Sequence, residues 1–170
     1  MREVKLDKKA FGSIVEEYGK AIFNAAFRIV NDYEDAMDIT QNTFIKAYER
    51  ADKYDPSHDV FSWLYKIAVN EAINVARRNS RAVELDDDMC VQSRNPETEY
   101  IQNETSVRLQ KALMGLSLDY RTVLILRHFQ GLSYEAISGI LGIPVKTVKS
   151  RLFSGRRLRR DSLVAMGYTP

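Results

Sequence analysis

The stretch LSYEAISGILGIPVKTVKSRLFSGRRLRR, residues 132–160, carries the strongest structural signal in the sequence. Ser133 is placed to cap a first helix, and Gly142 suits the left-handed conformation of a tight turn. Pro144 then stands at the first turn of a second helix, where its missing N–H costs least. Two helices joined by a short glycine-containing turn form a helix-turn-helix, and we expect one here.

The second of these helices has an inner and an outer face. At 100° per residue, Val145, Val148 and Leu152 share one face and point inward. The outer face and its flanks carry hydroxyls, cations and one aromatic ring: Lys146, Thr147, Lys149, Ser150, Arg151, Phe153, Ser154 and Arg157. Small hydroxyls let a helix enter the major groove, while Lys and Arg reach base edges or phosphates. We therefore predict that this face binds duplex DNA, with packing against a neighbouring helix as the alternative role of Phe153.

Charge is distributed unevenly along the 170 residues, although the formal total is only +2. Residues 1–80 have a net charge of −1, residues 81–105 of −5 and residues 106–170 of +8. Seven Lys and Arg and no acid fall within residues 142–160. This segregation favours a polyanionic partner for the C-terminal part, the alternative being a solvated basic helix.

Composition excludes several classes of protein. No run approaches the roughly 20 apolar residues of a membrane span, and the N-terminus lacks a secretory signal. The single cysteine, Cys90, cannot form an internal disulfide and favours a cytoplasmic location. With only His58 and His128 beside it, a structural zinc site has too few ligands. We expect no metal, no cofactor and no direct insertion into a membrane.

Helical spacing recurs through the first part of the chain. Apolar residues follow one another at steps of three and four over residues 11–30 and again over residues 33–51. Pro56 breaks this pattern, and a third helix is predicted from about Val60 to Arg78.

No strand-like alternation persists anywhere, so the predicted fold is all-α. Residues 81–104 are acidic and aperiodic, which predicts a flexible linker. It joins two small helical domains, residues 1–80 and residues 105–170, the second a four-helix domain that contains the helix-turn-helix.

The third predicted helix carries a polar stripe. Trp63, Lys66, Asn70, Asn74 and Arg77 recur at steps of three and four and therefore share one face. An aromatic plane, two amides and two cations can stack on and hydrogen-bond to exposed bases. The alternative is that Trp63 is an ordinary half-buried packing residue.

The second predicted helix turns Asp35, Asp38, Asn42, Ile45 and Glu49 away from its apolar side, with Gln41 at the margin. Acids around an exposed Ile suit a protein partner that carries Arg or Lys. The Glu-x-x-His pattern of an iron-binding bundle is missing from this helix.

Taken in order, DAMDITQNTFIKAY, FSWLYKIAVNEAINVARR, the acidic linker and the helix-turn-helix resemble the extracytoplasmic function (ECF) class of bacterial sigma factors, over roughly residues 8–165. The resemblance implies a protein that binds core RNA polymerase, recognises the −35 and −10 promoter elements and assists promoter melting. It implies no enzymatic activity, a cytoplasmic location and an anti-sigma factor as a further partner.

The resemblance also implies roles for residues. It puts Asp35, Asp38, Gln41, Asn42 and Ile45 on the polymerase, Trp63, Asn70, Asn74 and nearby residues at the −10 element, and Lys146, Lys149, Ser150 and Phe153 at the −35 element. With the rest of each helix face, the candidates are Trp63, Lys66, Asn70, Asn74, Arg77 and Arg78 for the −10 element and the eight outer residues of the helix-turn-helix given above for the −35 element. The loop KYDPSHD, residues 53–59, resembles the segment that pockets a flipped base, and the linker would thread toward the polymerase active site. Asn74 and Ser154 depart from the residues common in the family, which leaves the promoter sequence open.

Two other functions remain possible at this point. One is a stand-alone helix-turn-helix regulator whose front domain senses a signal or dimerises. The other is a hydrolase with a DNA-binding tail, although the front half has no Gly-rich phosphate loop and no His-based dyad.

Overall fold

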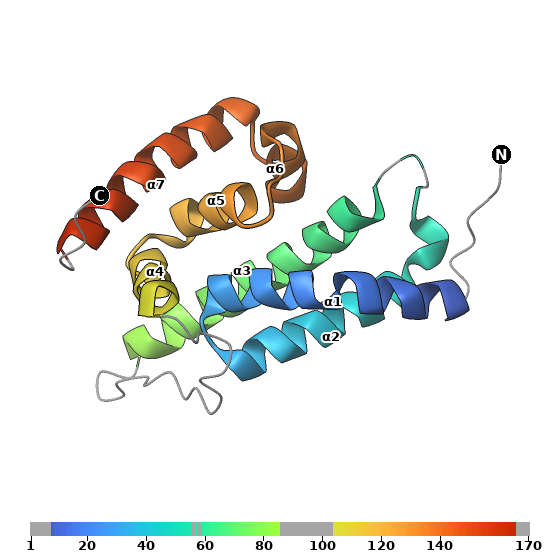
Figure 1. The fold of residues 1–170 in the computed structure, drawn as a ribbon. Coiled ribbons are helices and arrows are strands. Elements are labelled where there is room, and N and C mark those ends of the chain that lie inside the picture. Colours follow the sequence, from blue (N-terminus) through green and yellow to red (C-terminus); the bar gives the residue numbers. More distant parts are fainter. Residues whose placement is uncertain (1–7, 56, 58, 86–103, 166–170) are drawn as a thin grey trace.

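The computed structural model describes residues 8–55, 57, 59–85 and 104–165, which form seven α-helices and one short 3-10 helix (Figure 1). The elements are α1 (Lys8–Val30), α2 (Tyr33–Glu49), η1 (Ala51–Lys53), α3 (Val60–Leu85), α4 (Glu104–Met114), α5 (Leu118–His128), α6 (Tyr134–Leu141) and α7 (Val145–Ala165). The described residues contain no strand, and the prediction of an all-α fold is confirmed. Helices α1–α3 make the first domain, and α4–α7 make the predicted four-helix second domain.

The break between α1 and α2 is built from two polar residues. Asn31 has a left-handed backbone, with φ of 58°, which ends α1. The side chain of Asp32 then accepts a hydrogen bond from the Asp35 backbone N–H at 2.9 Å and caps α2. The turn lets the two helices pack side by side, and Ile22 and Ala25 of α1 and Ile39 of α2 are buried.

Helix α3 is longer than the sequence analysis predicted. It continues past Arg78 to Leu85, into the stretch expected to begin the linker. Residues 80–85, SRAVEL, contain neither Gly nor Pro, so nothing local ends the helix there. The rest of the predicted linker, residues 86–103, lies outside the described residues.

The helix-turn-helix has the local bonds that the sequence led us to expect. Ser133 accepts from the Ala136 N–H at 3.1 Å, and Gly142 adopts φ of 65° at the end of α6. The hydroxyl of Ser138 donates to the Ile143 carbonyl at 2.5 Å, which ties α6 to the turn. The Pro144 carbonyl accepts from Val148, so α7 begins immediately after the proline.

Helix α7 lies very close to α5 at Gly155. A Cβ atom added to this glycine would lie 3.1 Å from Leu124 Cδ1 and 3.4 Å from Tyr120 Cβ. Val148 and Leu152, which share this face of α7, are also buried. The contact fixes the orientation of α7, and therefore of its outer face, relative to the rest of the second domain.

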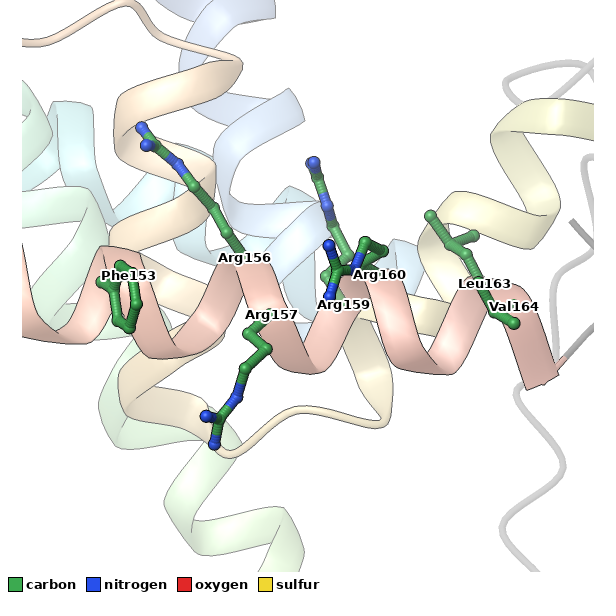
Figure 2. Close-up of a pocket in the computed structure, with 7 residues that line it drawn as sticks. All are labelled: Phe153, Arg156, Arg157, Arg159, Arg160, Leu163 and Val164. Atoms are coloured by element: carbon green, nitrogen blue, oxygen red, sulfur yellow. The ribbon is translucent and has the colours of Figure 1, made fainter. Parts of the chain in front are cut away.

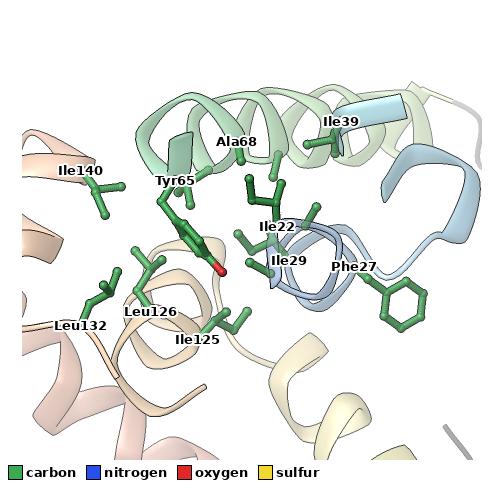
Figure 3. Close-up of a cluster of buried hydrophobic side chains, with 14 of the residues drawn as sticks. Ile22, Phe27, Ile29, Ile39, Tyr65, Ala68, Ile125, Leu126, Leu132 and Ile140 are labelled. Atoms are coloured by element: carbon green, nitrogen blue, oxygen red, sulfur yellow. The ribbon is translucent and has the colours of Figure 1, made fainter. Parts of the chain in front are cut away.

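The two domains pack directly against each other, α3 against α6 and α1 against α5. Tyr65 of α3 is fully buried at this junction and points between α1 and α5 (Figure 3). Its hydroxyl lies 2.9 Å from the Ala21 carbonyl and 2.6 Å from Oε1 of Gln130, so it has an acceptor in each domain. Burial raises the pKa of Tyr65, which keeps the phenol protonated as a donor. The guanidinium of Arg28 also stacks on the Phe129 ring across the junction, at 3.9 Å.

Gly155→Val tests the close approach of α7 to α5. The larger side chain must displace Leu124, so we expect the free energy of unfolding to fall by about 1–3 kcal/mol. Gly139→Val is the matched control, because an added Cβ there meets nothing within 4 Å. Urea denaturation of both variants measures the difference, and equal stability of the two would contradict the packing described here.

Candidate nucleic-acid and protein interfaces

The outer face of α7 is open to solvent along most of its length. Lys146, Lys149, Ser150, Phe153 and Arg157 are exposed, and Thr147 and Ser154 are half-buried between them. Phe153 is 73% exposed, so it does not pack against a neighbouring helix. An exposed ring among cations is chemically suited to contact a sugar or a thymine methyl group.

Arg151 differs from the other predicted DNA-binding residues. Its Nη2 lies 2.7 Å from Oδ2 of Asp119 in α5, and only 26% of its side chain is exposed. The guanidinium therefore holds α7 against α5, and contact with DNA would have to compete with this ion pair.

The C-terminal half of α7 carries a shallow groove of about 540 Å³ (Figure 2). Its lining combines apolar residues with arginines: Phe153, Leu163, Val164, Arg156, Arg157, Arg159 and Arg160. Leu163 and Val164 were not among the predicted site residues, although they follow Phe153 and Arg160 at helical spacing. The groove is thus both basic and apolar. Binding to nucleic acid would require its cations but not its apolar residues.

His128 of α5 supports the basic side of this groove. The Nε of Arg156 donates to His128 Nε2 at 3.2 Å. Burial lowers the pKa of His128, and the charges of Arg156, Arg159 and Arg127 lower it further. A neutral imidazole can accept the Arg156 hydrogen bond, whereas an imidazolium cannot.

A second polar surface follows α3. Lys66, Asn70, Asn74, Arg77 and Arg78 are exposed, whereas Trp63 at the start of the row is half-buried. This row lies opposite the apolar face that α3 turns toward the core.

The Trp63 ring packs on Tyr54, with ring centroids 5.0 Å apart. Burial and the nearby carboxylates of Asp59 and Asp55 raise the pKa of Tyr54. Tyr54 belongs to the loop 53–59 that resembles a base-pocketing segment, but it was not named as a site residue; its position shortly before Trp63 was the signal that could have singled it out. Pro56 and His58 of the same loop lie outside the described residues.

A third surface lies on α2. Asp38, Gln41, Asn42 and Ile45 are exposed, whereas Asp35 is half-buried and accepts a hydrogen bond from Asn79 Nδ2 at 2.8 Å. Ile45 is 55% exposed. Met37 and Tyr48 are exposed as well. The spacing Met37, Gln41, Ile45, Tyr48 could have predicted this apolar row, in which the sequence analysis recognised only Ile45.

The described part of the chain shows neither a cluster of metal ligands nor a helix that could cross a membrane. Within it, no three His, Cys, Asp or Glu side chains gather where they could hold a metal ion. None of its helices is both long and apolar enough to cross a bilayer.

Two family descriptions match the chain, one for each domain. Sigma-70 region 2 matches residues 14–82, and Sigma-70 region 4 matches residues 106–158. The RNA polymerase sigma-H factor of Pseudomonas aeruginosa is 34% identical over 162 residues, which cover 88% of this chain and 84% of that protein. The ECF RNA polymerase sigma factor SigW of Bacillus subtilis is 33% identical, and the match covers 94% of this chain and 91% of SigW.

Solved structures agree with these matches. The sigma factor RpoE of Bartonella quintana, in complex with the anti-sigma factor NepR, superposes with a TM-score of 0.78 at 28% identity, covering 91% of this chain and 97% of RpoE. CnrH, in complex with the cytosolic domain of CnrY, superposes with a TM-score of 0.72 at 25% identity, covering 94% of this chain and 90% of CnrH.

Proposed function

The chain belongs to the ECF family of RNA polymerase sigma factors, and we propose that its three exposed surfaces divide the work of transcription initiation. As the sequence analysis predicted, it is a sigma factor that acts with RNA polymerase at promoters. The matches to both sigma-70 regions favour this function over a stand-alone regulator or a hydrolase. The observation that carries the proposal is that each surface faces outward from one folded chain while the apolar side of its helix is buried.

The α2 surface is proposed to bind core polymerase. Its acids and its apolar row, with Ile45 at the centre, fit a partner that presents basic and apolar side chains. The resemblance to the family suggests the clamp helices of the largest polymerase subunit as that partner. Met37 and Tyr48 extend the predicted set of polymerase-binding residues.

The α3 surface is proposed to hold the −10 element as unpaired bases. Asn70 and Asn74 can hydrogen-bond to base edges, while Lys66, Arg77 and Arg78 can pair with phosphates. Trp63 on Tyr54 offers a rigid aromatic platform for stacking. Unstacking a base costs a few kcal/mol, and stacking on an aromatic side chain returns about 1–3 kcal/mol.

The α7 surface is proposed to read the −35 element as duplex DNA. Lys146, Lys149, Ser150 and Phe153 occupy the exposed part of the helix after the turn, which is the part that a helix-turn-helix puts into the major groove. Arg157 and the arginines beyond it are assigned to phosphate contacts, which position the protein without reading sequence. Arg151 is left as a structural residue because Asp119 already holds it.

The polymerase supplies the chemistry in this scheme, so the chain needs no catalytic group or cofactor of its own. Its work is expected to take place in the cytoplasm, where the polymerase meets DNA. The acidic segment 86–103 would run toward the polymerase active site, as the resemblance suggests.

An anti-sigma factor is proposed as a further partner. The related RpoE and CnrH structures each contain a second protein, and in the first it is named as an anti-sigma factor. The groove on α7, with Leu163 and Val164 between arginines, fits a partner helix with an apolar face and acidic edges.

Charge reversal on α2 tests the polymerase surface. The double variant Asp38→Arg/Ile45→Arg should weaken binding to core polymerase by about tenfold or more, because it removes an apolar contact and places cations against a basic partner. Glu16→Arg, an equally exposed acid on α1, is the control and should bind as the wild type does. Fluorescence anisotropy with labelled protein measures both, and unimpaired binding by the double variant would count against this surface.

Alanine substitutions on α3 test base capture. Trp63→Ala and Asn70→Ala should each slow promoter opening, Trp63→Ala by about tenfold. Permanganate footprinting of unpaired thymines follows the opening. A promoter with a pre-melted bubble is the control, since it removes the cost of opening and should restore most of the activity. Wild-type opening by both variants would show that the stripe does not contact bases.

Substitutions on α7 separate sequence reading from phosphate binding. Ser150→Ala and Lys149→Ala should change which −35 sequences are preferred while leaving affinity for core polymerase intact. Arg157→Gln should weaken binding to all sequences alike and reduce the slope of log affinity against log salt by about 1. Selection from a randomised −35 library, repeated at several salt concentrations, distinguishes the two. If Ser150→Ala weakened every sequence equally, its role would be phosphate contact.

A further inference from the structure

A pocket of about 550 Å³ lies where the end of α3 meets the start of α5. It is lined by residues of both domains, among them Arg77, Ser80 and Arg81 of α3, Ser117 just before α5, and Asp119 and Arg121 of α5. None of the surfaces assigned above uses Ser80, Arg81, Ser117 or Arg121. The pocket therefore needs an explanation of its own.

Arg121 is the most unusual residue of this pocket, because its charged side chain is only 7% exposed. Its Nη1 donates to the thioether sulfur of Met114 at 2.6 Å, a neutral and weak acceptor. Its Nε is buried and has no hydrogen-bond partner in the described part of the chain. Burial lowers the pKa of Arg121, yet a guanidinium stays charged in proteins. A buried cation without a carboxylate is costly, and a bound anion would satisfy it.

Two more guanidiniums face the same space. Arg77 and Arg81 lie one turn apart on α3, and among the described residues neither has an ion pair or a hydrogen-bonded side-chain partner. Asp119 is the acid that lines the pocket, and its carboxylate is already paired with Arg151 at 2.7 Å. Among the described residues that line it, the pocket therefore has three guanidiniums without a carboxylate partner and one acid that is already paired.

The backbone adds positive potential at the same place. Ser117 precedes α5 as its N-cap residue, but its side chain makes no capping hydrogen bond. The first N–H groups of α5 thus lack the usual side-chain acceptor, and the Ser117 hydroxyl remains available to a ligand. Amides at a helix start and guanidiniums are both groups that bind phosphate oxygens.

We infer that this pocket binds the phosphate group of a small molecule, either inorganic phosphate or a phosphate monoester such as a nucleotide. Three guanidiniums and the Ser117 hydroxyl match the charge and the several acceptor oxygens of a phosphate dianion better than they match a single carboxylate. A backbone phosphate of nucleic acid fits less well, because it carries a sugar on each side whereas Arg121 is almost fully buried. The volume of the pocket suits a ligand of nucleotide size.

A ligand in this pocket would touch both domains at once, since α3 belongs to the first domain and Arg121 to the second. Bound phosphate would therefore favour the packed arrangement in which Tyr65 is buried between them. This gives the binding a readout that is independent of transcription: a rise in the midpoint of thermal unfolding.

Isothermal titration of the full chain with sodium phosphate, at constant ionic strength balanced with chloride, tests the inference. The wild type should bind one phosphate per chain, with a rise in the midpoint of thermal unfolding. Arg81→Gln and Arg121→Gln should each lower the affinity by about tenfold or more, as expected for the loss of a charge-assisted contact. Arg50→Gln removes the same charge from an exposed residue that neither lines the pocket nor belongs to an assigned surface, so its phosphate affinity should be unchanged.

Further titrations distinguish the possible sources of the phosphate group. Adenosine monophosphate should compete with phosphate, and adenosine should not. Arg81 is exposed, so Arg81→Gln keeps the test valid even if Arg121→Gln fails to fold. Absence of saturable phosphate binding would overturn the inference, as would equal losses in Arg50→Gln and Arg81→Gln. The inference would also fail if phosphate did not bind at all while Arg81→Gln weakened binding to duplex DNA. In that case the pocket would bind the DNA backbone.

Discussion

The burial of one apolar face along α3 is the constraint on which the other features depend. Leu64, Tyr65, Ala68 and Ala72 are almost completely excluded from water, and the helix packs on α1, α2 and α6. A helix of 26 residues is about 39 Å long, so α3 is long enough to contact the second domain as well as the first. Because its inner face is fixed, the polar row that includes Asn70 must face solvent. Tyr65, with an acceptor in each domain, links the two halves at the centre of this face.

Burial of one face of each helix also explains how one chain combines a small total charge with strongly charged surfaces. Helix α7 buries Val148 and Leu152 on one side and holds its cations on the other. Helix α2 turns acids and Ile45 outward instead. Under the proposed assignment, opposite electrostatic surfaces on separate helices would allow polymerase and DNA to be bound at the same time without competition. The separation of charge thus supports the division of work proposed for this sigma factor.

Sequence patterns predicted the features that depend on residues close together in the chain. Ser133, Gly142 and Pro144 marked the helix-turn-helix because caps and turns depend on residues that are neighbours in sequence. The pairing of Tyr65 with Gln130, the stacking of Arg28 on Phe129 and the buried Arg121 were not predictable in this way, because each depends on how distant helices pack. The end of α3 was missed because the charged residues after Arg78 resemble a linker in composition while still favouring a helix.

The central claim is that this chain makes RNA polymerase specific for promoters. Transcription in vitro with purified core polymerase, the chain and a random library of promoter sequences tests it most directly. The account predicts transcripts that start downstream of one shared pair of sequence elements, and only when the chain is present. Transcripts without such elements, or none above those of core polymerase alone, would contradict it.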